Sequence, residues 1–194
     1  MIDPVKVTDF GQSEARLQEN ILFWVCAAGK NGRTAARCLD KFLGLVRVPH
    51  STPFDAVCMV DEVYNLPDMM KSCGIGCYTS KAKSFRQLAN SGINLKTCTV
   101  DDLEKIHGIG MKTSRCFVMH SRKESNCAGI DTHILKHLRA NGVKDVPKST
   151  PGSKKLYLRL EKEVLRLAKE AGMAPADYDL MVWNHYSVQS TPRN

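Results

Sequence analysis

The sequence predicts an all-α fold, and three observations support this prediction. Apolar residues recur at helical spacing, most clearly in the stripe formed by Leu156, Leu160, Val164 and Leu167. No segment alternates between apolar and polar residues for long enough to indicate a strand. Breaks rich in glycine, proline and small polar residues divide the chain into about ten short segments. These breaks fall at residues 46–53, 74–76, 92–94, 108–110, 144–153 and 172–175.

Composition and charge narrow the class of protein. A chain of 194 residues with 43% apolar and 25% charged residues can form one compact unit or two small lobes, and its composition excludes a disordered chain. The apolar segment 21–28 is far shorter than the roughly 20 residues of a membrane span. The N-terminus carries no targeting pattern, so we expect a soluble protein without a membrane partner. The net charge of +8 fits a nucleic-acid partner, although it also fits an inert basic surface.

The eight cysteines indicate a reducing, intracellular compartment. None forms a Cys-x-x-Cys pair, and Cys73 and Cys77 are the only two that lie close in sequence. No further ligands stand near them at metal-binding spacing, so we expect reduced thiols and no side-chain metal site.

Two helix starts are signalled by capping residues. Thr150, followed by Pro151, is the predicted N-cap of the helix that carries the apolar stripe. Thr99 followed by Asp102 resembles a capping arrangement and should start the helix before the break at 108–110.

That break contains the most informative motif of the chain. Gly108-Ile109-Gly110 separates two helical segments, and Lys112 follows in the first turn of the second. Glycines there let backbone N–H groups approach a phosphate at a helix N-terminus. Further along, Gly129-Ile130-Asp131-Thr132-His133 places a carboxylate at the start of another helix. Taken alone, such a lysine is ordinarily solvated and such an aspartate is ordinarily a plain N-cap.

Together these residues resemble the helix-hairpin-helix glycosylase superfamily, which includes endonuclease III and the 8-oxoguanine DNA glycosylases. The resemblance implies two helical lobes with the active cleft between them. Residues 21–128 would form the lobe with the hairpin, and residues 1–20 with 129–194 would form the other. Many endonuclease III relatives carry an iron–sulfur cluster near the C-terminus, but the last cysteine here is Cys127, so no such cluster is expected.

The resemblance also implies a chemistry. Removing a base from DNA develops oxocarbenium character on the sugar, which a carboxylate at Asp131 would stabilise. The Lys112 amine would attack C1′ and form a Schiff base, which permits elimination of the 3′ phosphate. Superfamily members with a lysine at this position are bifunctional glycosylases with AP-lyase activity.

Three residues match the base pocket of 8-oxoguanine glycosylases. Cys116, four positions after Lys112, resembles the cysteine that packs against the flipped purine. Asp179 and Trp183 resemble the pair that hydrogen-bonds its Watson–Crick edge and stacks on its other face. Each also has a plainer interpretation, since Cys116 and Trp183 fit a core and Asp179 fits an exposed surface.

Other residues are candidates for DNA contact. The turn at 76–82 is similar to the endonuclease III turn whose leucine wedges into the duplex, with Cys77 in place of the leucine. Lys30 or Asn31 would replace the glutamine that fills the gap left by the flipped base. The hairpin of such proteins often holds a monovalent cation through backbone carbonyls. The candidate DNA-binding residues are Gly108, Gly110, His133, Lys30, Asn31, Cys77, Tyr78 and Lys81, with Lys83, Arg86, Lys136 and Arg139 as further basic candidates.

We therefore predict a monomeric base-excision repair enzyme that acts on double-stranded DNA containing a damaged base and requires no cofactor. The predicted activity is excision of 8-oxoguanine by base flipping, followed by β-elimination. The first alternative is an endonuclease III-like glycosylase for oxidised pyrimidines, which the turn at 76–82 favours. The second is a non-catalytic helix-hairpin-helix module that only grips the DNA backbone.

Overall fold

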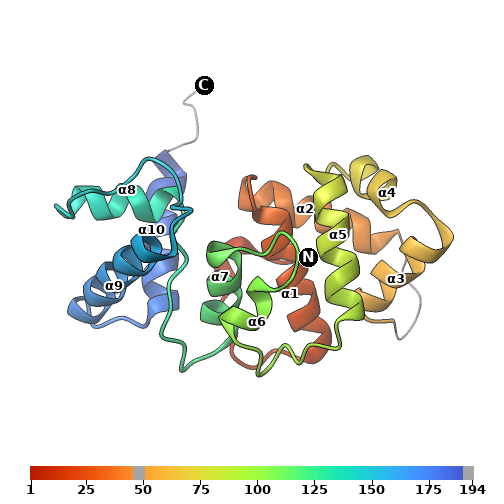
Figure 1. Ribbon diagram of the computed structural model, residues 1–194, viewed down its shortest axis with the longest axis horizontal. Coiled ribbons are helices and arrows are strands. Elements are labelled where there is room, and N and C mark those ends of the chain that lie inside the picture. Colours follow the sequence, from red (N-terminus) through yellow and green to blue (C-terminus); the bar gives the residue numbers. More distant parts are fainter. Residues whose placement is uncertain (46–50, 190–194) are drawn as a thin grey trace.

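The structure is a computed structural model that describes residues 1–45 and 51–189 (Figure 1). Within these residues the regular elements are all helices, so the all-α prediction is confirmed. Residues 46–50, part of the first predicted break, lie outside the described residues. The elements are η1 (Pro4–Lys6), α1 (Glu14–Ala27), α2 (Gly32–Gly44), α3 (Pro53–Val63), α4 (Leu66–Ser72), α5 (Tyr78–Asn90), α6 (Val100–Glu104), α7 (Met111–Ser121), α8 (Thr132–Ala140), α9 (Lys154–Glu170) and α10 (Pro175–Gln189).

The helices form two groups. Helices α8, α9 and α10 lie together on one side of the molecule, and α1 to α7 form the larger group on the other (Figure 1). Helix α1 lies at the centre of the larger group, where it packs against α2 and α7. One hydrophobic core runs through both groups, and α10 contacts α7 across the boundary. Within the described residues, no helix combines the length and the apolar composition that crossing a membrane requires.

The N-terminal segment differs from its predicted place in the second lobe. Helix α1 begins at Glu14 and continues past residue 20 without a break, and η1 packs against α2. The backbone N–H of Asp9 donates to the carbonyl of His120 at 3.0 Å, near the end of α7. Residues 1–20 therefore belong with α1 to α7. A helix that spans a proposed boundary cannot be divided there, because its backbone hydrogen bonds cross it.

The capping predictions had different outcomes. The capping box at α6 is confirmed, since the Asp102 N–H donates to the Thr99 hydroxyl at 3.1 Å and the Thr99 N–H donates to the Asp102 carboxylate at 3.0 Å. The predicted N-cap at Thr150 is wrong. Helix α9 begins at Lys154, with Ser153 as its N-cap. The Thr150 hydroxyl instead donates to the Ile130 carbonyl at 2.9 Å, a long-range hydrogen bond that local sequence does not reveal.

A buried ionic network joins α7 to its neighbours. The side chain of Arg115, on α7, is 4% exposed. Its Nε donates to Glu161 of α9 at 2.8 Å, and its Nη1 donates to Glu104 of α6 at 2.5 Å. A buried guanidinium is tolerated only where carboxylates compensate it, so this network fixes the three helices relative to one another.

The same network holds the linker that leads into α8. The Glu161 carboxylate accepts a hydrogen bond from the Ala128 N–H at 2.9 Å. The hydroxyl of the fully buried Tyr157 donates to the Ala128 carbonyl at 3.1 Å and accepts from the Ile130 N–H at 2.9 Å. Residues 128–130 are therefore fixed by α9 immediately before Asp131.

Candidate active site

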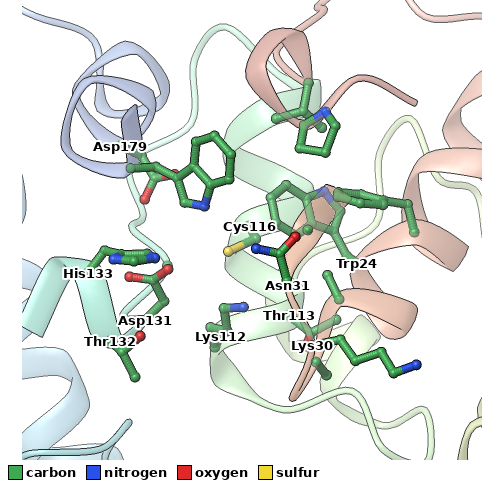
Figure 2. A pocket seen from close by; sticks show the side chains of 18 of the residues that line it. Trp24, Lys30, Asn31, Lys112, Thr113, Cys116, Asp131, Thr132, His133 and Asp179 are labelled. Carbon is green, nitrogen blue, oxygen red and sulfur yellow. The ribbon is translucent and has the colours of Figure 1, made fainter. Parts of the chain in front are cut away.

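A cavity of about 720 Å³ lies between the two groups of helices, and most of the predicted site residues line it (Figure 2). They come from both sides, with α7 on one wall and the start of α8 together with the middle of α10 on the other. The predicted residues that the cavity brings together are Lys30, Asn31, Lys112, Cys116, Asp131, His133, Asp179 and Trp183.

The hairpin places Lys112 at this cavity. Gly108 has a φ of +75°, which favours glycine, and a Cβ added there would lie 2.7 Å from the Ser84 hydroxyl. The Ile109 N–H then donates to the Ile106 carbonyl at 3.1 Å and closes the turn. Helix α7 begins at Met111, so Lys112 stands in its first turn, where backbone N–H groups are free to meet an anion.

Asp131 faces the same cavity from the start of α8. One oxygen of its carboxylate accepts the Ile134 N–H at 2.8 Å, so the residue is the N-cap of that helix. In Figure 2 the Asp131 and Lys112 side chains lie on opposite sides of the cavity. Burial and the neighbouring carboxylate of Asp179 raise the pKa of Asp131, whereas the Lys112 amine opposes that rise. Asp131 is therefore the N-cap of α8, and its role in catalysis stays a prediction.

Helix α7 presents three side chains to the cavity on one face. Lys112, Cys116 and His120 are spaced four residues apart, which places them in one row along a helix. Cys116 is buried, and burial raises the pKa of its thiol, so the sulfur is a neutral packing group rather than a nucleophile. Gly129 lies against it, since a Cβ added there would stand 2.3 Å from the Cys116 sulfur.

Asp179 and Trp183 come from α10, as their four-residue spacing predicts. The Asp179 Oδ2 lies 3.2 Å from the Nε2 of His120. Trp183 approaches the opposite group of helices, where a Cβ added at Gly32 would lie 3.9 Å from its ring. Residues of both groups therefore line this end of the cavity.

Lys30 and Asn31 line the cavity, and the side chains of both make hydrogen bonds to nearby backbone groups. The Lys30 amine donates to the Gly74 carbonyl and points away from the cavity centre (Figure 2). This bond joins the turn after α1 to the turn that precedes Cys77. The Asn31 side-chain carbonyl oxygen accepts the N–H groups of Arg33 at 3.0 Å and Thr34 at 3.3 Å, which caps α2.

The remaining candidates for DNA contact lie outside the cavity lining. Cys77 is exposed and has a φ of 52°, an unusual value for a residue other than glycine. Tyr78 follows as the first residue of α5, with the Lys71 amine 5.5 Å from the centre of its ring. Gly108 and Gly110 are exposed at the hairpin. A role for these residues in DNA binding stays a prediction.

The structure contradicts the predicted contact of Lys81 with DNA. Its side chain is buried, and its amine donates to the Cys26 carbonyl at 2.8 Å and to the Ala28 carbonyl at 3.0 Å. It therefore satisfies carbonyls at the end of α1 and is not exposed to a DNA backbone. The sequence held a signal for this, because Lys81 is in helical register with the buried Phe85 and Leu88.

The cavity also contains residues that the sequence analysis missed. His120 is fully buried, and the ring of Trp24 stacks on it with 5.4 Å between centroids. Gly129 contacts Cys116 as described above. His120 could have been found, because it continues the four-residue spacing of Lys112 and Cys116.

The described residues contain no group of histidine, cysteine, aspartate or glutamate side chains that could hold a metal ion. All eight cysteines are free thiols.

Comparison with known proteins places this site in a family context. A family model described as 8-oxoguanine DNA glycosylase matches residues 66–173, more than half of the chain. A protein of Thermotoga sp. (strain RQ2) named 8-oxoguanine DNA glycosylase/AP lyase is 34% identical over 77 residues, which are 39% of this chain and 36% of the relative. The protein of the same name from Thermotoga maritima is 32% identical over the same length. These matches thus span about a third of the curated relatives' own length.

Two solved structures share the fold. The crystal structure of the 8-oxoguanine DNA glycosylase of Thermotoga maritima has a TM-score of 0.67 and 24% identity, and the match covers 94% of this chain and 84% of that one. The Methanocaldococcus jannaschii 8-oxoguanine glycosylase/lyase, solved with a 15mer DNA containing 8-oxoguanine, has a TM-score of 0.68 and 20% identity. That match covers 94% of this chain and 86% of the other. The arrangement of two helical lobes with a helix-hairpin-helix is therefore confirmed.

Proposed function

The chain belongs to the 8-oxoguanine DNA glycosylase family of helix-hairpin-helix proteins, and on this basis we propose that it is a bifunctional DNA glycosylase/AP lyase that excises 8-oxoguanine. The observation that carries the proposal is the placement of Lys112 and Asp131 on facing sides of one cavity (Figure 2). A cavity of about 720 Å³ is large enough to hold one extruded nucleotide.

The proposed reaction begins when the neutral amine of Lys112 attacks C1′ of the flipped nucleotide. The C1′–N bond breaks, its electron pair leaves with the base, and the base takes up a proton. The carboxylate of Asp131 stabilises the positive charge that develops on the sugar. The C1′–O4′ bond then breaks, O4′ takes up a proton while the attached nitrogen loses one, and a Schiff base forms between Lys112 and C1′. The Schiff base acidifies the C2′ hydrogen, and loss of that proton expels the 3′ phosphate. Water finally releases Lys112.

The lesion would be read at the end of the cavity away from Lys112. Asp179 offers carboxylate oxygens to the N–H donors of a guanine edge, and Trp183 offers an apolar face for stacking. Cys116 and Gly129, which lie against each other, form an apolar wall of this part of the cavity. An oxidised pyrimidine has a smaller ring system and would fill this space less completely, which makes the endonuclease III-like activity the second candidate.

We further propose that the enzyme acts as a monomer on duplex DNA. The net charge of +8 and the exposed hairpin support binding of the phosphate backbone, with a monovalent cation held by hairpin carbonyls. Asn31, His133, Cys77 and Tyr78 are the proposed DNA contacts beside the cavity. The eight free thiols support a reducing intracellular compartment, and the proposed chemistry needs no cofactor.

Trapping on a panel of lesions tests the proposal. Duplexes carrying 8-oxoguanine, an oxidised pyrimidine, an abasic site or undamaged guanine are incubated with the protein and borohydride, which reduces a Schiff base to a stable adduct. We expect an adduct with 8-oxoguanine and abasic DNA that Lys112→Gln abolishes. Lys162→Gln is the matched control, because Lys162 is an exposed lysine of α9 outside the cavity.

The outcomes separate the candidates. An adduct formed with the oxidised pyrimidine in preference to 8-oxoguanine would favour the endonuclease III-like activity. Binding of every duplex without any adduct would favour the non-catalytic module. An adduct that survives in Lys112→Gln would remove Lys112 from the mechanism.

A further inference from the structure

We propose that His120 is a positioning residue that holds the Asp179 carboxylate in the orientation needed to read the flipped base. This inference rests on the proposed function and adds to it a residue that would determine specificity without touching the substrate sugar. It starts from a chain of hydrogen bonds from the N-terminal segment, through α7, to α10.

The chain has three members. The Thr8 hydroxyl lies 2.7 Å from Nδ1 of His120, and Nε2 of His120 lies 3.2 Å from Oδ2 of Asp179. An ionised carboxylate can only accept hydrogen bonds, so Nε2 must carry the hydrogen. In the tautomer with its hydrogen on Nε2, the Nδ1 atom accepts from the Thr8 hydroxyl. The Asp179 carboxylate thus selects this tautomer, and Thr8, whose hydroxyl can donate, satisfies the other ring nitrogen.

Packing keeps the imidazole in place. The His120 side chain is fully buried, and its ring lies nearly parallel to that of Trp24, with 14° between the planes. The His120 carbonyl accepts the Asp9 N–H at 3.0 Å, which fixes the N-terminal segment and brings Thr8 to the ring. A ring covered by stacking and bonded at both nitrogens cannot turn without breaking all of these contacts.

The hydrogen bond from His120 determines which acceptor sites of Asp179 face a ligand. Its side chain is 16% exposed, and the hydrogen bond from His120 occupies one side of Oδ2. Oδ1 and the second lone pair of Oδ2 are left to accept hydrogen bonds from a ligand. Two adjacent acceptors fit the adjacent N1–H and N2–H donors of a guanine-type base. Without His120 the carboxylate could rotate about its side-chain torsions and lose this match.

The length of α7 places this pair away from the nucleophile. Lys112 and His120 are eight residues apart, which corresponds to about 12 Å along a helix. An amine acting at C1′ and a carboxylate acting at the far edge of the base are therefore supported by opposite ends of one helix. Removal of His120 should affect base reading far more than chemistry at the sugar.

The test compares two reactions of the same protein. Excision of 8-oxoguanine requires the base to be read, whereas β-elimination at a preformed abasic site does not. His120→Phe keeps an aromatic ring against Trp24 but removes both hydrogen bonds. We expect its single-turnover excision rate to fall about 10- to 100-fold, as the loss of a hydrogen bond to a charged group predicts, and its elimination rate to fall far less.

Two further variants separate positioning from damage to the fold. His120→Gln retains an N–H donor near the position of Nε2, so it should recover part of the lost excision. In an Asp179→Ala background, His120→Phe should lower excision no further, because the carboxylate through which it acts is gone. Equal loss of both reactions, no recovery in His120→Gln, or an additive effect in the Asp179→Ala background would overturn the inference.

A binding measurement keeps the inference separate from the proposed function. In the Lys112→Gln background no turnover is needed, and the affinity ratio between 8-oxoguanine and guanine duplexes is measured by fluorescence anisotropy. We expect His120→Phe to lower this ratio about 10-fold or more, and an unchanged ratio would overturn the inference. Absence of both reactions in the unaltered protein would instead refute the proposed function.

Discussion

The hydroxyl of Tyr157 holds the linker before Asp131, and its removal should be costly. Tyr157→Phe keeps the ring and its packing but leaves the Ala128 carbonyl and the Ile130 N–H without this partner. Both residues are buried, at 1% and 0% exposure. An unsatisfied buried polar group costs about 1–3 kcal/mol, so two of them should lower the free energy of unfolding by roughly 2–6 kcal/mol.

Urea unfolding followed by circular dichroism measures this loss. Tyr178→Phe is the matched control, because the Tyr178 hydroxyl makes a hydrogen bond, at 2.7 Å, to the half-buried side chain of His137 rather than to buried backbone. That side chain can turn to water, so we expect a loss of about 0.5–1.5 kcal/mol. Equal losses in the two variants, or a loss below about 1 kcal/mol in Tyr157→Phe, would refute the reasoning that the hydroxyl satisfies the linker.

Three further predictions follow from contacts at the site. Lys81→Met should lower the free energy of unfolding by about 1–3 kcal/mol, because two carbonyls at the end of α1 lose their donor. The control Lys83→Met, on the exposed face of the same helix, should change it by less than about 0.5 kcal/mol. Equal effects of the two substitutions in urea unfolding would contradict this prediction. Gly129→Ala should cost about 1–3 kcal/mol by overpacking against Cys116, and adding Cys116→Ala should restore most of the loss in the same assay. Asp131→Asn should lower single-turnover excision about 100-fold or more, because the proposed stabilising carboxylate is lost. The same substitution should raise the melting temperature at pH 7, because the folded protein raises the pKa of the Asp131 carboxyl and so disfavours its charged form, while asparagine still caps the helix. The gain in melting temperature should shrink as pH falls and Asp131 becomes protonated in the folded state; a gain independent of pH would count against the assignment.

Local patterns in the sequence predicted much of the fold and of the site. The capping box at Thr99, the hairpin and the helix starts at Lys112 and Asp131 all depend on neighbouring residues, so a linear reading can find them. The four-residue spacing of Asp179 and Trp183 correctly placed both at one cavity.

The errors arose where a distant partner decides the role of a residue. Thr150 has the features of a helix cap, yet its hydroxyl bonds the linker 20 residues earlier in the chain. Lys81 is basic and lies in the segment 76–82, which resembles a DNA-contacting turn of endonuclease III, yet its amine donates a hydrogen bond to the end of a helix more than 50 residues earlier in the chain. The role of His120 depends on Thr8 and Asp179, whose proximity is a property of the folded chain alone.

The row of Lys112, Cys116 and His120 on α7 also restricts how this protein can evolve. One inserted or deleted residue between Lys112 and His120 would turn the helix beyond it by about 100° around its axis and move His120 out of the row that Lys112 begins. Substitutions preserve that phase, whereas length changes destroy it. We therefore expect the proposed lesion preference to change by exchange of single side chains on α7, with insertions and deletions confined to the connecting loops.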